Sequence, residues 1–120
     1  MRFLNSSVLV WPNQRQVDEA ARAWATKEAR KHPELNRLGY FGSYARGDWG
    51  VGSDLDLVAV VEDSSEPFER RALSWDLHPL PVPADLLVYT ELEWDRMERE
   101  ARAFFRRLAG ELSWIYPHRP

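Results

Sequence analysis

Apolar positions recur along the first half of the chain at two spacings, one typical of helices and one typical of strands. Residues 13–31 carry apolar side chains at helical spacing with charges on the other face, which predicts an amphipathic helix ending before Pro33. The side chains expected to face inward are Val17, Ala20, Ala21, Trp24 and Glu28. Residues 7–11 form a short β-prone run, and residues 38–41 and 54–61 are predicted strands. The last of these becomes continuously apolar, as a central strand covered on both faces does.

The second half of the chain continues this alternation of elements. A helix-entry signal predicts a short helix over residues 64–75, and three prolines make residues 79–83 an extended connector. Residues 85–89 are a predicted strand, and residues 112–116 are expected to form a final edge strand. Strands that alternate with helices predict an α/β or α+β fold with one sheet, in one domain that spans residues 1–120.

A longer helix is expected between these last two strands. Thr90 and Glu93 have the spacing of a capping box, so this helix should begin beside Thr90, and Gly110 is expected to close it. Its inward face is expected to consist of Met97, Ala101, Phe104, Phe105 and Leu108.

Composition and charge narrow the class of protein. The 120 residues have a formal net charge of -3, which disfavours a general nucleic-acid coat, since that function needs a cationic surface. The absence of cysteine excludes disulfides, thiolate zinc sites and thiol nucleophiles. The longest purely apolar run, residues 57–61, is far shorter than the roughly 20 residues that span a bilayer. Residues 1–5 do not resemble a signal peptide, so we expect a cytoplasmic protein without a membrane anchor.

The most informative acids are Asp54 and Asp56, which begin the predicted central strand. Residues two apart on a strand project from the same face, roughly 6–7 Å apart along the chain. Two such carboxylates repel each other unless a positive charge lies between them, and a hard divalent cation such as Mg²⁺ suits these oxygen ligands. The alternative is that Asp54 lies in a turn and only Asp56 enters the strand, at its solvated rim.

A glycine-rich loop precedes this strand and begins with Gly42 and Ser43. Gly42 lies where a strand should end and a short helix should begin, a place where backbone amides attract anions and a missing side chain permits close approach. The Ser43 hydroxyl adds a donor, so a phosphate held here would lie beside a metal on the two aspartates. The alternative is a tight turn in which the glycines serve backbone geometry alone.

Together the two halves form the sequence Gly42-Ser43, ten further residues, then Asp54-Leu55-Asp56. This arrangement resembles the signature of the nucleotidyltransferase superfamily that includes DNA polymerase β. The amino-acid sequence around this motif is similar to that of the minimal nucleotidyltransferases, which are small proteins often encoded beside an all-helical HEPN partner. The resemblance implies a polymerase β palm-like fold, in which helices flank a single mixed β-sheet.

In that superfamily a third carboxylate, on a later strand, completes the metal site. The candidate is Asp85, which begins the predicted strand over residues 85–89 and is followed by apolar residues. Asp76 and Glu91 are competitors, but Asp76 falls near a helix end and Glu91 is already explained by the dipole of the helix it begins.

The resemblance also implies a mechanism. Asp54, Asp56 and Asp85 are expected to be catalytic and to bind two Mg²⁺ ions that bridge them to the phosphates of a nucleoside triphosphate, with ATP the expected substrate. Asp85 would serve the ion nearest the acceptor hydroxyl and is a candidate to take its proton. Gly42, Ser43 and Ser53 are expected to contribute to nucleotide binding. Arg46 is expected either to contact the triphosphate or to form an ion pair with Asp48.

The acceptor remains open at the level of sequence. Only 35 residues follow Asp85, enough for one helix and one strand, so we expect the acceptor to be held by another molecule or by a second subunit of a homo-oligomer. The resembling families act as antitoxins that transfer AMP to a tyrosine of a HEPN toxin. Two alternatives are a non-catalytic antitoxin that neutralises its partner by direct contact and a transferase that acts on a small molecule.

Overall fold

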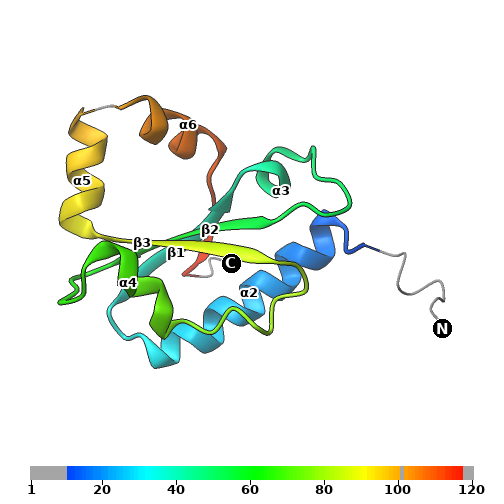
Figure 1. Ribbon diagram of the computed structural model, residues 1–120, viewed down its shortest axis with the longest axis horizontal. Coiled ribbons are helices and arrows are strands. Elements are labelled where there is room, and N and C mark those ends of the chain that lie inside the picture. The colour runs from blue at the N-terminus through cyan, green and yellow to red at the C-terminus, as the bar shows by residue number, and fades with distance from the viewer. Residues whose placement is uncertain (1–10, 101, 118–120) are drawn as a thin grey trace.

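The computed structural model describes residues 11–100 and 102–117. Within these residues helices and strands alternate along the chain (Figure 1). The elements are α2 (Gln14–Lys31), β1 (Leu35–Phe41), α3 (Ser43–Arg46), β2 (Leu55–Val61), α4 (Phe68–Arg71), the 3-10 turn η1 (Ala72–Ser74), β3 (Ala84–Thr90), α5 (Glu91–Glu100), α6 (Ala103–Glu111) and β4 (Ser113–Tyr116).

The four strands form one mixed sheet in the order β3-β2-β1-β4. Strand β2 is parallel to β3 and antiparallel to β1, and β1 is antiparallel to β4. The sequence-based expectation of a single mixed sheet flanked by helices is therefore confirmed, and so is the placement of the last strand at a sheet edge.

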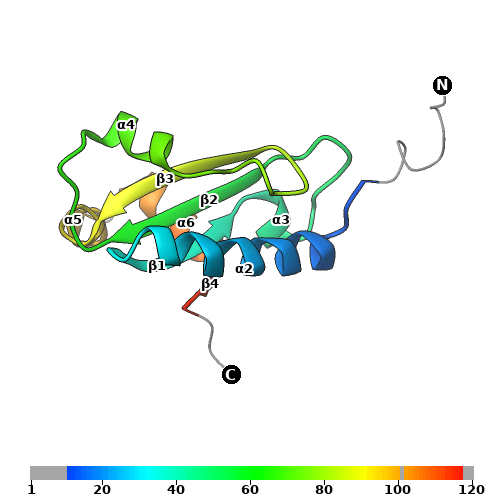
Figure 2. The ribbon, with the colours of Figure 1, turned by 90° about the horizontal axis from the view of Figure 1, so that it is seen from below.

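Helices cover both faces of the sheet, with α2 on one face and α5 and α6 on the other (Figures 1 and 2). Strand β2 divides its apolar side chains between the two faces, as the two-residue period of a strand dictates. Leu55, Leu57 and Ala59 join the core beneath α2, whereas Val58 and Val60 pack with the residues of α5 and α6. The continuously apolar run in this strand reflects its position between two cores.

The first helix forms where the sequence predicts it. Asn13 caps α2, because its side chain accepts a hydrogen bond from the Gln16 amide while the Gln16 side chain accepts one from the Asn13 amide. Val17, Ala21 and Trp24 are buried against the sheet, in agreement with the helical spacing of the sequence. No helix in the described part of the chain is long and apolar enough to cross a membrane.

One long helix was expected between β3 and β4, and this expectation is wrong. Two helices, α5 and α6, occupy the segment, and Arg102 between them has an extended backbone with ψ 153°. The break lets Trp94 of α5 and Phe105 of α6 meet edge to face, with ring centroids 5.0 Å apart, over the same face of the sheet. A straight helix of about 20 residues would be roughly 30 Å long and would carry its second half away from that face. Gly110 accordingly lies inside α6 and does not close the helix.

Other sequence-based boundaries differ only slightly. Strand β1 begins at Leu35, three residues before the expected position, and the short helix expected over residues 64–75 is the α4–η1 pair. The capping box at Thr90 is present, since the Thr90 amide donates to Glu93 Oε1 at 2.9 Å and the Glu93 amide donates to Thr90 Oγ1 at 3.2 Å. Residues 7–10 of the expected β-prone run lie outside the described residues.

Candidate active site

The turn between β1 and α3 lies directly against β2. Gly42 has φ 80° and ψ -155°, a backbone conformation that is essentially restricted to glycine. A Cβ atom on Gly42 would collide with Asp56 Oδ2. Both the backbone conformation and the lack of space for a Cβ atom therefore require glycine at position 42. The main chain before Ser43 lies in contact with the Asp56 carboxylate there.

The three aspartates singled out by the sequence lie at the beginning of two neighbouring strands. Asp54 immediately precedes β2 and does not lie in a turn, so the alternative is correct that only Asp56 enters the strand and wrong about the turn. Asp56 pairs with Asp85 in the parallel register of β2 and β3. Paired residues of adjacent strands project from the same side of a sheet, so Asp56 and Asp85 lie side by side on the face that α5 and α6 cover farther along.

The electrostatics of this group centre on Asp56. Partial burial raises the pKa of the Asp56 carboxyl, the negative charges of Asp85 and then Asp54 raise it further, and Arg46 opposes them. Within residues 11–100 and 102–117, no hydrogen-bond donor is paired with the Asp56 carboxylate. A cation placed between the aspartates would offset both the free-energy cost of burying the Asp56 charge and the repulsion between the carboxylates.

The aspartates do not by themselves form a closed metal cage. Among the described residues, no group of three or more histidine or acidic side chains stands close enough together to hold a metal ion. The donor set is nevertheless of the hard oxygen type that Mg²⁺ prefers, and Mg²⁺ commonly binds through one or two carboxylates together with substrate phosphates. The residues present therefore fit a magnesium ion that binds along with the nucleotide.

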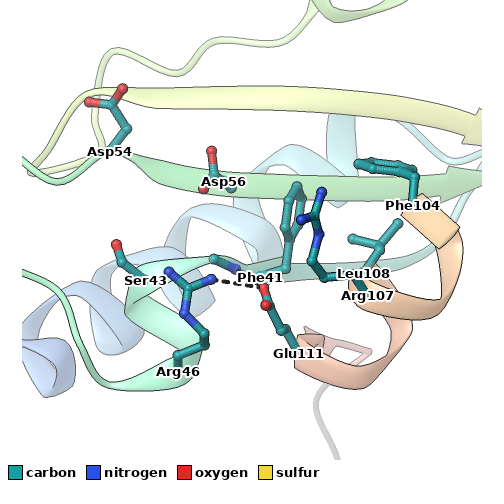
Figure 3. Close-up of a pocket in the computed structure, with 10 residues that line it drawn as sticks. Phe41, Ser43, Arg46, Asp54, Asp56, Phe104, Arg107, Leu108 and Glu111 are labelled. Carbon is teal, nitrogen blue, oxygen red and sulfur yellow. Dashed lines mark hydrogen bonds and ion pairs between the residues drawn. The ribbon is translucent and has the colours of Figure 1, made fainter.

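A cavity of about 410 Å³ opens between the pair Asp54 and Asp56 and helix α6 (Figure 3). Asp54 and Asp56 lie on one side of it, and Ser43 and Arg46 face them from the β1–α3 region (Figure 3). Gly42 also lines this cavity. Two parts of the chain that the sequence separates by ten residues thus share one cavity, as the motif predicts.

Arg46 forms ion pairs with two acids while its guanidinium lines the cavity. Its Nε donates to Asp48 Oδ2 at 3.1 Å, and its Nη1 donates to Glu111 Oε1 at 3.1 Å. The expected ion pair with Asp48 is present while the guanidinium still lines the cavity, so the two readings of Arg46 do not exclude each other.

Ser53 and Asp85 are placed differently from the other candidates. The Ser53 hydroxyl accepts a hydrogen bond from the Gly50 amide at 2.8 Å and so shapes the glycine-rich loop, and Ser53 is not among the residues that line the cavity. Its role in nucleotide binding stays a prediction. Asp85 lines a second cavity of about 560 Å³, whose wall also includes Leu73 and Leu77. Asp56 lines both cavities.

The competing acids have other partners. Glu91 accepts hydrogen bonds from Asn36 at 2.9 Å and from Arg37 at 3.2 Å. The Asp76 side chain accepts from the His78 amide at 3.1 Å. Neither acid lines either of the two cavities, whereas Asp85 does.

Helix α6 contributes residues to the site that sequence reasoning missed. The expectation that Phe104 belongs to the core is wrong, because 43% of this residue is exposed and it lines the cavity of the two aspartates. Arg107, Leu108 and Glu111 line the same cavity. Positions 104, 107, 108 and 111 follow the i, i+3, i+4, i+7 pattern of one helix face, a signal hidden by the assumption that one helix ran from Thr90 to Gly110.

Comparisons with known proteins indicate a nucleotidyltransferase domain. The family model described as "Nucleotidyltransferase domain" matches residues 23–108. A Sulfolobus solfataricus protein assigned as a nucleotidyltransferase is similar in structure, with a TM-score of 0.57 and 27% sequence identity over 69% of this chain and 75% of that chain. No curated protein matches the sequence.

A second solved structure shares the fold at lower identity. It is described as a toxin–antitoxin with AMP-PNP, and its matched chain has a TM-score of 0.50 and 18% identity over 79% of this chain and 72% of that chain. The family match covers well over half of the sequence and includes both halves of the Gly42-Ser43 and Asp54–Asp56 motif. The chain belongs to the nucleotidyltransferase domain family.

Proposed function

We propose that this protein is a magnesium-dependent nucleotidyltransferase that transfers AMP from ATP to a hydroxyl group of a partner protein. The observation that carries the proposal is the position of Asp56, which lies beside Asp85, faces Gly42 and Ser43, and lines two cavities. A transferase needs such an arrangement, because donor and acceptor must approach one reacting centre from different sides.

The cavity beside Ser43 suits the nucleotide. The Ser43 hydroxyl and the Arg46 guanidinium line it and would bind the β- and γ-phosphates, and Arg107 adds a second positive charge. Asp54, Asp56 and Asp85 would hold magnesium, which when bound neutralises phosphate charge and stabilises the charge that develops during transfer. Two ions would suit three carboxylates that lie at the start of two neighbouring strands.

The cavity beside Asp85 suits the acceptor. Its wall combines this carboxylate with apolar side chains, among them Leu73 and Leu77, so an aromatic hydroxyl such as that of tyrosine would match it. The acceptor oxygen would attack the α-phosphorus as the bond to the β-phosphate breaks. Pyrophosphate would leave through the first cavity, and the hydroxyl proton would pass to the Asp85 carboxylate.

The proposed partner is a HEPN-domain toxin, which the protein would neutralise as its antitoxin. The motif around Gly42 and Ser43 resembles that of minimal nucleotidyltransferases with this role. A solved toxin–antitoxin that contains AMP-PNP has the same fold, which supports an adenine nucleotide and a toxin partner.

The test is label transfer to the protein encoded beside this one. With α-labelled ATP and Mg²⁺, we expect label on the partner, whereas γ-labelled ATP should give none, because the nucleotidyl group and not the terminal phosphate moves. Partner variants with tyrosine replaced by phenylalanine would locate the acceptor. Competition by GTP, CTP and UTP would test the preference for ATP.

The control is a double variant, Asp54→Asn with Asp56→Asn. Equal labelling by the wild type and this variant, or no labelling of the partner by either, would contradict the transferase proposal. If this variant still neutralised the partner as well as the wild type does, the non-catalytic antitoxin would be the better description. Labelling of a small molecule without the partner would favour the third alternative.

A further inference from the structure

Helix α6 ends with an acid whose carboxylate already occupies anion-binding donors of the candidate active site. Glu111 Oε1 accepts a hydrogen bond from the Gly42 amide at 3.1 Å and another from Arg46 Nη1 at 3.1 Å (Figure 3). Both donors meet the same oxygen atom. The Glu111 side chain is 19% exposed and the Arg46 side chain 45% exposed, so the contact with the Gly42 amide is the more buried of the two.

A main-chain amide and a guanidinium that converge on one oxygen form a typical environment for a phosphate oxygen. The surrounding charge makes the presence of a carboxylate there unexpected. Asp54 and Asp56 line the same cavity, so Glu111 adds a third negative charge to a site that Arg46 and Arg107 only partly balance. The charge on Glu111 acts against that of Asp56 across the cavity.

We propose that the Glu111 carboxylate occupies the subsite of the terminal phosphates of the nucleotide and that binding of a triphosphate displaces it. The inference rests on the proposed function, since it assumes that the phosphate chain binds at Gly42 and Arg46. Glu111 is then an internal competitor that weakens binding and restricts the site to ligands whose phosphate chain can replace it.

The displacement requires a rotation of the Glu111 side chain and no movement of the helix. Phe105 and Leu108 anchor α6 in the core on the same face of the sheet. Strand β4, which begins two residues after Glu111, lies so close to β1 that a Cβ atom on Gly39 would be 2.6 Å from the Ser113 carbonyl oxygen. The backbone around Glu111 is therefore held on both sides.

The decisive variant is Glu111→Gln, which keeps the shape and an accepting oxygen but removes the charge. In this variant the contact with the Gly42 amide becomes a neutral hydrogen bond and the contact with Arg46 loses its ion pair, so the internal competitor should weaken and triphosphate affinity should rise about fivefold. Titration calorimetry with Mg²⁺ would compare ATP, inorganic tripolyphosphate and adenosine. We expect tighter binding of ATP and tripolyphosphate and unchanged binding of adenosine, which has no phosphate.

Two further variants separate this effect from its alternatives. Glu98→Gln changes the net charge equally from an exposed position on α5 and should leave all three affinities unchanged. Glu111→Asp retains the charge but retracts the carboxylate by one methylene, so its triphosphate affinity should lie between those of the wild type and Glu111→Gln. Thermal unfolding of each variant would confirm that it folds.

The outcomes distinguish the inference from the function on which it rests. If the wild type binds ATP and Glu111→Gln binds it equally well or more weakly, Glu111 only orients Arg46 and the inference is wrong, while the nucleotidyltransferase proposal stands. If neither protein binds ATP or tripolyphosphate, both proposals fail. Equal tightening by Glu98→Gln would reduce the effect to net charge and would also overturn the inference.

Discussion

Glu28 is a fully buried acid and Asp56 a partly buried one, and they lie on opposite sides of the same sheet. The groups that surround the two carboxylates differ. Glu28, only 2% exposed, lies 3.1 Å from Lys31 Nζ and accepts a hydrogen bond from the Asp76 amide at 3.4 Å. Asp56 has no such donor among the described residues, and its pKa is raised by burial and by the neighbouring acids Asp85 and Asp54.

The difference indicates that Glu28 contributes to the stability of the fold, whereas Asp56 is suited to bind a cation. A buried carboxylate costs free energy unless charged or hydrogen-bonding partners compensate for the loss of water. Glu28 has these partners within the protein and connects α2 to the segment before β3. Asp56 lacks them, so the folded chain retains an unfavourable negative charge that a ligand cation can satisfy.

The largest effect should follow from removal of the Asp56 charge. Asp56→Asn should lower kcat for AMP transfer about 10³-fold, since metal-assisted charge stabilisation contributes several kcal/mol to such reactions. The measurement is the rate of label transfer from α-labelled ATP. Glu28→Gln should leave kcat of the folded protein unchanged, and equal losses in the two variants would erase the distinction drawn between these acids.

The next effect concerns the contact that brings Gly42 against Asp56. Gly42→Ala should lower the free energy of unfolding by about 3 kcal/mol, because its backbone conformation strains other residues and the new Cβ would collide with Asp56 Oδ2. Transfer activity should fall with it. Urea unfolding and label transfer would measure both effects.

Gly47→Ala is the matched control for that substitution. Gly47 also has a positive φ, of 89°, but a Cβ atom there would meet nothing within 4 Å. It should lose only about 1 kcal/mol from backbone strain and retain its activity. If both glycine variants lost activity equally, the close approach to Asp56 would not be what matters.

On the other face of the sheet, Glu28→Ala should lower the free energy of unfolding by about 2 kcal/mol, since it leaves the Asp76 amide without its acceptor and opens a small cavity. Urea denaturation at neutral pH would measure the loss. Glu19→Ala on the same helix removes an exposed acid that pairs with Arg15 at 3.1 Å, and should cost less than about 0.5 kcal/mol. A Glu28 variant as stable as the Glu19 variant would show that the buried contacts do not stabilise the fold.

The smallest predicted effect concerns the Asp56 carboxyl, whose removal should raise the free energy of unfolding instead of lowering it. The pKa of Asp56 is raised in the folded state. The contribution of this carboxyl to the free energy of unfolding is therefore fully present below the unfolded-state pKa. It is lost as pH rises through the folded-state pKa. Metal-free Asp56→Asn should therefore be more stable than the wild type near neutral pH, by less than about 1 kcal/mol because the side chain is partly solvated.

Thermal unfolding of the metal-free proteins between pH 3 and 8 tests this sign. The gain in stability of Asp56→Asn over the wild type should shrink as pH falls and the wild-type carboxyl becomes protonated. A variant that was less stable than the wild type throughout this range would show that Asp56 stabilises the fold, as Glu28 does.

The local elements were largely predictable because their signals lie within a few residues of one another. The Asn13 cap and the spacing of Val17, Ala21 and Trp24 define α2, and the apolar run after Asp56 defines the central strand. The break at Arg102 was not predictable from helix propensity, because the contact of Trp94 with Phe105 decides it. That error concealed the face of α6 that carries Phe104 and Glu111 toward the site.

The sequence by itself determined the family, the alternation of strands and helices, and a motif whose glycine, serine and aspartates have the chemistry for phosphate and magnesium. Only the tertiary structure decided that Asp85 pairs in register with Asp56 and that Glu111 reaches the Gly42 amide. The physical reason is that strand pairing and helix docking depend on shape and burial across the whole core. Residues 29 and 69 positions apart in the chain therefore meet through packing that no short stretch of sequence encodes.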